Sequence, residues 1–174
     1  HDGCSTESVE EAEVVAREVD RMLGTVWTNQ HGETRPLEAA DIMVVAPYND
    51  QVNLIGRTLF DRGLGDVPVG TVDRFQGQEA AVVFYTMTAS STADAPRGVG
   101  FLFSQNRLNV AISRARCLAF LVSTPNLFNV KAGSVSTMRL VANLCAFRVE
   151  ANVAISPAGV RAAGRDQSPS VRHG

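Results

Sequence analysis

Apolar residues recur along the chain in two alternating patterns. After Ser8 they return at helical spacing as far as Leu23, and Ser8 together with Glu11 forms a capping box at the start of this segment. Further along, short continuous apolar runs are separated by segments with helical spacing, which is typical of strands buried in a parallel sheet. The pattern predicts helices over 9–23, from 49 or 50 onward, over 105–116 and over 134–149, and strands over 42–46, 67–72, 80–88 and 117–123.

The alternation of strands and helices predicts an α/β fold in which helices flank a parallel central sheet. Residues 28–36 are polar around a glycine and residues 89–100 are rich in small residues, so both segments are predicted to be loops. We expect one domain over 1–150 and a flexible tail over 151–174, where no periodic pattern remains. Ligands of such sheets bind at the carboxyl ends of the strands. The segments expected to carry a site are the loops after Ala46, Val72 and Ser123 and the helix that begins at Gln105.

Length and composition restrict the class of protein. The chain has 174 residues, of which 45% are hydrophobic and 20% charged, as in one ordinary globular domain and unlike collagen, coiled coils or disordered chains. No apolar run reaches the roughly 18–20 residues of a membrane helix and no signal peptide is visible, so we expect a cytoplasmic protein without membrane contact. The three cysteines and three histidines lack metal-ligand spacing, so no metal site is expected. Because the chain begins with His1, we expect a fragment of a longer protein.

The net charge of −2 is an average over two unlike parts. Residues 1–66 carry 13 acidic and 5 basic side chains, and residues 67–174 carry 5 acidic and 11 basic, which gives net charges of −8 and +6. The average argues against a phosphate-bearing partner, but the distribution removes that objection because a basic part can face phosphate groups. Arginines of the predicted tail contribute to this basic count.

A dense polar segment, 71–79, lies between two predicted strands. Thr71 and Asp73 have short side chains that can bind a phosphate or cap a turn. Gly77 permits a close approach or a backbone conformation that other residues avoid. The carboxylate of Glu79 suits the paired hydroxyls of a ribose. The same residues are also compatible with a capped turn that carries a surface ion pair, and the pattern by itself leaves both interpretations open.

A second segment, 106–116, combines an apolar helical stripe with arginines at its borders. The stripe consists of Leu108, Ala111, Ile112 and Ala115. Arg107 and Arg114, seven residues apart, are expected to line one border of this stripe, and Asn109 and Arg116 the other, where guanidinium groups can bind phosphate oxygens. The alternative is a solvated, purely structural helix, because the chain has 15 arginines and a single lysine.

Taken together, these segments resemble the C-terminal half of superfamily 1 helicases, in the branch of the nonsense-mediated-decay helicase and related nuclease-helicases. Residues 44–51, 71–79 and 107–116 resemble helicase motifs IV, V and VI, in the order and spacing of the family. The resemblance implies a RecA-like domain of the P-loop NTPase fold, the second of two such domains in an ATP-dependent helicase or translocase. Residues 134–149 resemble the end of actinobacterial proteins that join a RecB-like nuclease region to such a helicase.

The resemblance also implies roles for single residues at a nucleotide. Arg114 corresponds to the arginine finger that reaches the γ-phosphate of ATP. Glu79 would accept hydrogen bonds from the ribose, Gly77 would let the loop close on the nucleotide, and Gln76 would hold that loop. The two remaining nucleotide-binding candidates are Arg107 and Arg116, each of which could instead form an ion pair that orients motif VI.

Three further residues are implied to contact single-stranded DNA or RNA, namely Pro47, Tyr48 and Thr71. For Tyr48, packing at the end of a strand is an equal alternative. The chain has no Gly-Lys pair and no Asp-Glu pair, so it lacks a Walker A loop and the usual Mg²⁺-binding carboxylates. In the family both belong to an upstream RecA-like domain of the same polypeptide, so we expect that domain to hold ATP and Mg²⁺ and this chain alone to be inactive.

Two other classes of function remain open. The chain could be a RecA-like module that binds nucleic acid or a partner without turnover. It could also be a small α/β domain of flavodoxin type in which the arginine-rich helix is only structural.

Overall fold

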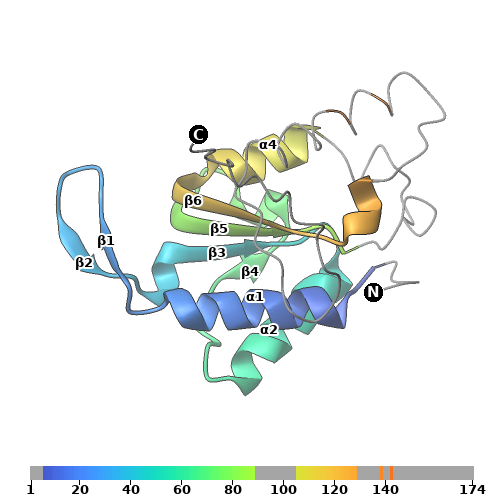
Figure 1. Cartoon of the computed structure of the whole chain (residues 1–174), viewed down its shortest axis with the longest axis horizontal. Helices are drawn as coiled ribbons and strands as arrows, with labels where there is room; N and C mark the ends of the chain where they lie inside the picture. Colours follow the sequence, from blue (N-terminus) through green and yellow to red (C-terminus); the bar gives the residue numbers. More distant parts are fainter. Residues whose placement is uncertain (1–5, 89–104, 129–137, 139–141, 143–174) are drawn as a thin grey trace, which may run out of the picture.

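The computed structural model describes residues 6–88 and 105–128, together with Met138 and Ala142. Its centre is a four-stranded parallel sheet in the order β4-β3-β5-β6 (Figure 1). The strands are β3 (Ile42–Val45), β4 (Val69–Gly70), β5 (Ala80–Thr86) and β6 (Ala115–Val122). All residues of β3 and β5 are buried, which explains why both appear in the sequence as continuous apolar runs. The predicted parallel sheet is confirmed.

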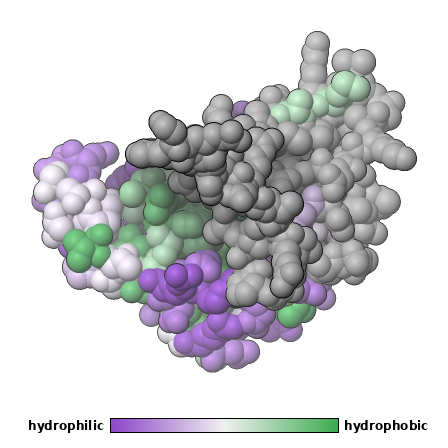
Figure 2. All heavy atoms as spheres, viewed as in Figure 1, coloured by the Kyte–Doolittle hydropathy of each residue, from purple (hydrophilic) through white to green (hydrophobic). Residues whose placement is uncertain are grey.

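Helices cover both faces of this sheet. The helices α1 (Val9–Met22) and α2 (Asn49–Asp61) lie on one face, and α4 (Gln105–Ser113) lies on the other (Figure 1). Successive residues of β3 alternate between the two layers: Ile42 packs in the cluster with α1 and α2, and Met43 packs in the cluster that α4 covers. Figure 2 shows that hydrophilic residues cover the outer side of α1 and α2. No helix among the described residues has the length and apolar character needed to cross a membrane.

The first helix is anchored to the second through its N-cap. The hydroxyl of Ser8 accepts a hydrogen bond from the Glu11 amide at 3.2 Å, as the predicted cap requires. The Ser8 amide donates to Oε1 of the fully buried Gln51 at 2.7 Å, and Gln51 Nε2 donates to the Ser8 carbonyl at 3.3 Å. The predicted capping box is therefore wrong in its second half, because Gln51 rather than Glu11 accepts from the Ser8 amide.

The polar segment predicted to be a loop contains an antiparallel hairpin, β1 (Val26–Thr28) and β2 (Thr34–Pro36). Its turn is closed by Asn29, whose Oδ1 accepts hydrogen bonds from the amides of His31 at 2.9 Å and Glu33 at 3.0 Å. Gly32 has a φ of +80°, a conformation that favours glycine. The hairpin projects from the end of the sheet where β3 begins (Figure 1). Its strands are only three residues long and mostly exposed, so they lack the apolar pattern that would predict them.

Other boundaries differ from prediction because strand pairing competes with local pattern. The helix predicted over 105–116 ends at Ser113, and Ala115 pairs with Ala80 in the sheet. Of the strand predicted over 67–72, only Val69–Gly70 pairs, and the next residues form the 3₁₀ helix η2 (Val72–Phe75). The other short helices are η1 (Ala39–Asp41) and η3 (Pro125–Phe128). The loop predicted over 89–100 and the tail over 151–174 lie outside the described residues, as does the helix over 134–149 except for helical Met138 and Ala142.

Candidate functional site

The candidate residues lie at two opposite edges of the sheet. Pro47 and Tyr48 follow β3 and Thr71 follows β4, so these three lie at the carboxyl edge. Glu79 directly precedes β5, so it lies at the amino edge. Because β4 and β5 run in the same direction, the segment between them must return from one edge to the other. The loop after Val72, which was expected to lie at the carboxyl ends of the strands, therefore leads to the amino edge, where the residues that follow Gly77 lie.

Two of the three candidate residues at the carboxyl edge are buried. Pro47 is buried and Tyr48 is only 6% exposed. Thr71 is half-buried, and its carbonyl accepts a hydrogen bond from the Arg74 amide at 3.0 Å as η2 begins. Thr71 is thus the most accessible of the three residues expected to contact nucleic acid.

The return toward the amino edge is made by η2 and a glycine turn. Phe75 anchors η2, because its side chain is 3% exposed and packs in the cluster beneath α4. Gln76 and Gly77 are exposed, and Gly77 has a φ of +80°, which other residues rarely adopt. No atom lies within 4 Å of the position that a β-carbon would take at Gly77, so the requirement for glycine here is conformational. The turn delivers Glu79 to the start of β5.

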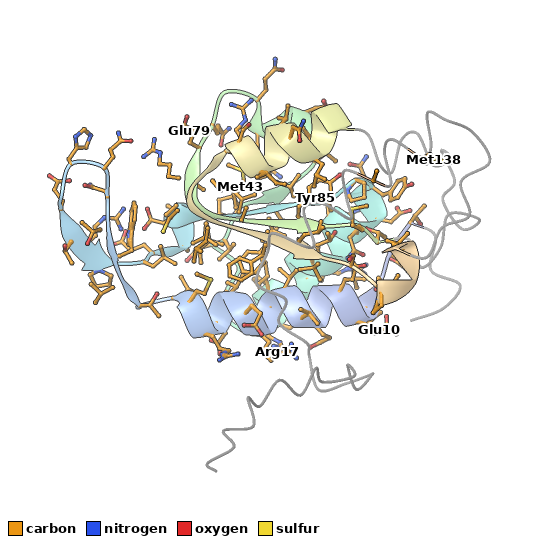
Figure 3. All side chains as sticks on the ribbon, turned by 45° about the horizontal axis from the view of Figure 1, so that its top comes forward. Glu10, Arg17, Met43, Glu79, Tyr85 and Met138 are labelled. Atoms are coloured by element: carbon orange, nitrogen blue, oxygen red, sulfur yellow. The ribbon has the colours of Figure 1, made fainter. Side chains whose placement is uncertain are left out.

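Glu79 and Arg116 form an ion pair at the amino edge. Arg116 Nε lies 2.9 Å from Glu79 Oε2, and the two side chains are 50% exposed for Glu79 and 48% for Arg116. Figure 3 shows Glu79 at the end of the sheet beside α4. The surface ion pair considered as the simpler interpretation of motif V is thus present, and its partner comes from motif VI.

A β-bulge gives Arg116 its position. Ala80 pairs with Ala115, whereas Val82 pairs with Leu118, so two steps along β5 correspond to three along β6. The extra residue falls at 116–117. A bulge of this kind changes the direction of a side chain and breaks the strict alternation of faces. Arg116 therefore belongs to an irregular strand start, and the predicted placement of Arg116 on a helix border is wrong.

Arg114 lies in the turn between α4 and β6, so its predicted place on the helix is wrong as well. Its carbonyl accepts a hydrogen bond from the Ala80 amide at 3.0 Å, which holds it beside Glu79 in the sheet. The side chain is half-buried, and its buried Nε has no hydrogen-bond partner among the described residues. A buried guanidinium N–H without an acceptor is unfavourable, so one donor of Arg114 remains unused among the described residues. Arg107 lies in α4, and its side chain is outside the described part of the structure.

Two charged residues near this edge were not among the candidates. Arg35 of the hairpin donates two hydrogen bonds of 2.6 Å to the carboxylate of Asp41, just before β3. This hydrogen bonding is the main cause that lowers the pKa of Asp41, and the charge of Arg116 adds to it. Arg35 also lies over the ring of Trp27, at 5.3 Å from its centroid. The sequence held no signal for this cluster, because its members come from a hairpin that the pattern did not predict.

The carboxyl edge of the sheet holds a buried carboxylate, Glu11, that the sequence marked only as part of a helix cap. Glu11 of α1 is 3% exposed, and its Oε2 accepts hydrogen bonds from the amides of Met87 at 3.1 Å and Thr88 at 2.9 Å. Burial raises the pKa of Glu11 from its usual value of 4.5 to about 8, against the lowering effect of these two amides. Thr88 has a φ of +68°, which is unusual for a β-branched residue. Glu11 therefore holds the end of β5 in a strained conformation.

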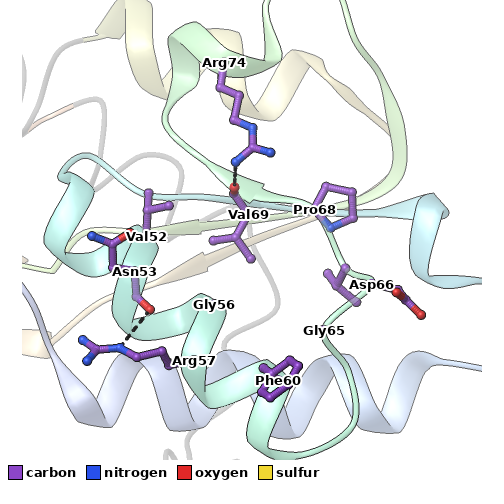
Figure 4. Close-up of a pocket in the computed structure, with 11 residues that line it drawn as sticks. Val52, Asn53, Gly56, Arg57, Phe60, Gly65, Asp66, Pro68, Val69 and Arg74 are labelled. Atoms are coloured by element: carbon purple, nitrogen blue, oxygen red, sulfur yellow. Dashed lines mark hydrogen bonds between the residues drawn. The ribbon is translucent and has the colours of Figure 1, made fainter.

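A hollow of about 590 Å³ lies between α2 and the edge strand β4 (Figure 4). Arg74 Nη1 donates to the carbonyl of Val69 at 2.8 Å, which covers a backbone acceptor of this edge strand. The lining residues are Val52, Asn53, Gly56, Arg57, Phe60, Gly65, Asp66, Val67, Pro68, Val69 and Arg74. None of the candidate residues lines this hollow. The candidate residues lie instead at the carboxyl and amino edges of the sheet.

A parallel sheet with helices on both faces, and with charged side chains gathered where two strands begin, defines an α/β domain of RecA-like type. Residues 2–126 match the family described as AAA domain (AAA_12), and the chain belongs to this family, within the superfamily 1 helicases of the nonsense-decay-helicase branch.

Named relatives agree with this assignment. The chain is 45% identical over 80 residues to "DNA polymerase alpha-associated DNA helicase A" of Schizosaccharomyces pombe, which covers 46% of the chain and 12% of that protein. It is 35% identical over 99 residues to "RNA helicase Mov10l1" of Homo sapiens, in a match that covers 55% of the chain and 8% of that protein. It is 40% identical over 80 residues to "DNA-binding protein SMUBP-2" of Rattus norvegicus, in a match that covers 46% of the chain and 8% of that protein. The matched part is thus about a tenth of each relative's length.

Proposed function

We propose that this chain is the second RecA-like motor domain of an ATP-dependent helicase or translocase that acts on DNA or RNA. The observation that carries the proposal is the pairing of β5 with β6, which brings the end of motif V and the end of motif VI to one edge of the sheet. Glu79, Arg114 and Arg116 meet there, although 34 residues separate Glu79 from the nearest arginine of the set. The names of the relatives, which include a DNA helicase and an RNA helicase, support the class of enzyme.

Arg114 is assigned as the arginine finger. Its backbone is fixed by the hydrogen bond from the Ala80 amide and its side chain is only half-buried, so the residue is held beside Glu79 while part of the side chain stays accessible to a phosphate. A guanidinium placed at a γ-phosphate neutralises charge that develops during phosphoryl transfer, an effect of about 10³–10⁵ in rate in related NTPases.

We assign the contact with the ribose to Glu79 of motif V, and closure over the nucleotide to the turn that precedes Glu79. The carboxylate of Glu79 is half-exposed, and its Oε1 has no hydrogen-bond partner among the described residues, so it can accept from ribose hydroxyls. Gly77 and Gln76 lie exposed in the preceding turn, where they can close over the nucleotide. Arg107 completes the proposed nucleotide-binding set, and Arg116 takes part in it through its ion pair with Glu79.

ATP fits this edge as a shared ligand. The described residues offer a carboxylate for the ribose and an arginine for a phosphate. They offer no group of three or more metal-ligating side chains that could hold an ion. We infer that an upstream RecA-like domain holds the triphosphate and Mg²⁺, which neutralises phosphate charge, and that this chain alone does not hydrolyse ATP.

Nucleic acid is assigned to the opposite edge. Thr71, the most accessible of the three candidates, would meet the backbone of a single strand, and the buried Pro47 and Tyr48 would support the neighbouring end of β3. The segment 71–79 then joins the nucleic-acid edge to the nucleotide edge directly, so a change at one end can move the other.

The test uses Arg114→Ala in the full-length polypeptide that contains this chain, with Arg57→Ala as the matched control. Arg57 is exposed on α2 and bonds only the Asn53 carbonyl, at 3.4 Å, among the described residues. We expect ATP hydrolysis stimulated by single-stranded nucleic acid to fall by about 10³ or more in Arg114→Ala. The control should retain wild-type activity. Unchanged hydrolysis in Arg114→Ala would refute the finger and favour a binding module without turnover.

A further inference from the structure

We propose that Arg116 is a positioning residue for Glu79 and thereby determines how well the enzyme distinguishes ribonucleotides from deoxyribonucleotides. The inference rests on the proposed function, because it needs Glu79 at the ribose. It departs from the expectation that Arg116 itself binds the nucleotide.

The contact between the two residues leaves one carboxylate oxygen for a ligand. Arg116 binds Glu79 through a single pair of atoms, Nε and Oε2, at 2.9 Å. Oε1 is left for a hydroxyl donor, and its direction is set once Oε2 is held. A carboxylate fixed in this way loses less freedom on binding than one that rotates in solvent, so its hydrogen bonds to the ribose are stronger.

The backbone around Arg116 favours this role over a purely structural one. The bulge at 116–117 costs one ladder position in β6 and turns the side chain toward the start of β5. Both side chains are about half-exposed, and ion pairs of that kind contribute little to stability. The irregularity therefore has its main effect on where the Glu79 carboxylate points.

The neighbouring charges keep Arg116 available to Glu79. The charge of Arg116 also acts on Asp41, but the two oxygens of Asp41 are both bound by Arg35 at 2.6 Å. Arg116 thus faces one occupied carboxylate and one carboxylate with which it forms its own hydrogen bond. Arg114, two residues earlier, supplies the guanidinium whose Nε has no acceptor among the described residues, so the two arginines have different tasks.

The experiment measures kcat and KM of the full-length enzyme with ATP and with 2′-deoxyATP, in the presence of single-stranded nucleic acid. The variants are Arg116→Ala, Arg116→Lys, Glu79→Ala and the double variant, with Arg57→Ala as control. We expect Glu79→Ala to abolish the preference for ATP. Arg116→Ala should raise the KM for ATP by about three- to tenfold, with kcat and the KM for 2′-deoxyATP within about twofold of wild type.

Two further results are expected if Arg116 acts through Glu79. The double variant should equal Glu79→Ala, because nothing remains to be positioned. Arg116→Lys should resemble Arg116→Ala, because lysine lacks the Nε donor.

The possible failures are distinguishable. If Arg116→Ala lowers kcat, or raises KM equally for both nucleotides, Arg116 contacts phosphate directly and the inference is wrong. If Glu79→Ala removes the ribose preference while Arg116→Ala leaves it intact, positioning is excluded but the ribose contact stands. If Glu79→Ala leaves both the preference and the KM for ATP unchanged, Glu79 does not contact the ribose, and the proposed ribose contact fails together with the inference. If it leaves the preference unchanged but raises the KM equally for both nucleotides, Glu79 contacts the 3′-hydroxyl, and only the inference fails.

Discussion

Replacement of Glu11 should change both the stability of the domain and its dependence on pH. The Glu11 carboxyl is buried and accepts hydrogen bonds from the Met87 and Thr88 amides at 3.1 and 2.9 Å. Glu11→Ala leaves both amides without this acceptor, and each buried unsatisfied group costs about 1–3 kcal/mol. We therefore expect a loss of about 2–6 kcal/mol in the free energy of unfolding. Glu11→Gln keeps an oxygen in the same place and should lose less.

The pH dependence follows from the direction of the pKa shift. Burial raises the pKa of Glu11 from 4.5 to about 8, so between these values the folded protein holds a proton that the unfolded chain releases. The stability due to the neutral carboxyl is fully present below pH 4.5, declines as pH rises toward 8, and changes no further above it. The slope in this window is at most about 1.4 kcal/mol per pH unit.

The assay is urea unfolding of the purified chain, followed by circular dichroism at about pH 5, 6, 7 and 8, which spans the window between the two pKa values. Wild type should lose stability across this range faster than Glu11→Gln, which cannot titrate. Parallel curves for the two proteins would show that Glu11 is ionised in the folded state, and that the burial argument is wrong. A loss well below about 1 kcal/mol in Glu11→Ala would show that Glu11 does not hold the end of β5.

Two further substitutions test the amino edge. Gly77→Ala should destabilise the domain by about 1 kcal/mol, because the site has a φ of +80° and open space around it; equal urea midpoints would contradict this. Arg35→Ala should raise the pKa of Asp41 toward its usual value. In the wild type, the stability from the Arg35–Asp41 pair is present above that usual value and is lost as pH falls through the depressed pKa of Asp41, and the variant should lack this contribution. Carboxyl NMR titration measures the shift, and an unchanged Asp41 pKa in Arg35→Ala would contradict the assigned cause.

The buried framework could be predicted from the sequence because its pattern is dictated by burial. Strands β3 and β5 are covered on both faces, so nearly every position is apolar and the runs at 42–46 and 80–88 stand out. The start of α1 is marked by Ser8, whose side chain caps it. The hairpin could not be predicted in the same way, because it is exposed and is held by Asn29 and by Arg35 rather than by a core.

The candidate residues were chosen from the sequence, but their arrangement could not be predicted from it. The motifs point to Glu79 and Arg114 as candidates, yet the proximity of these two residues depends on the pairing of Ala80 with Ala115, which is a long-range contact. The same pairing ends α4 at Ser113, against a local pattern that favoured a longer helix. Local propensity carries no information about the competition between a longer helix and strand pairing, so the bulge at 116–117 could not be predicted from the sequence.

The most direct test of the motor assignment is single-turnover hydrolysis of ATP by the full-length Arg114→Ala enzyme saturated with single-stranded nucleic acid. This measurement isolates the chemical step from product release. A finger at the γ-phosphate predicts a rate constant lower by about 10³ or more, with the Kd for ATP within a few-fold of wild type. A wild-type rate constant, with the nucleotide bound normally, would contradict the assignment.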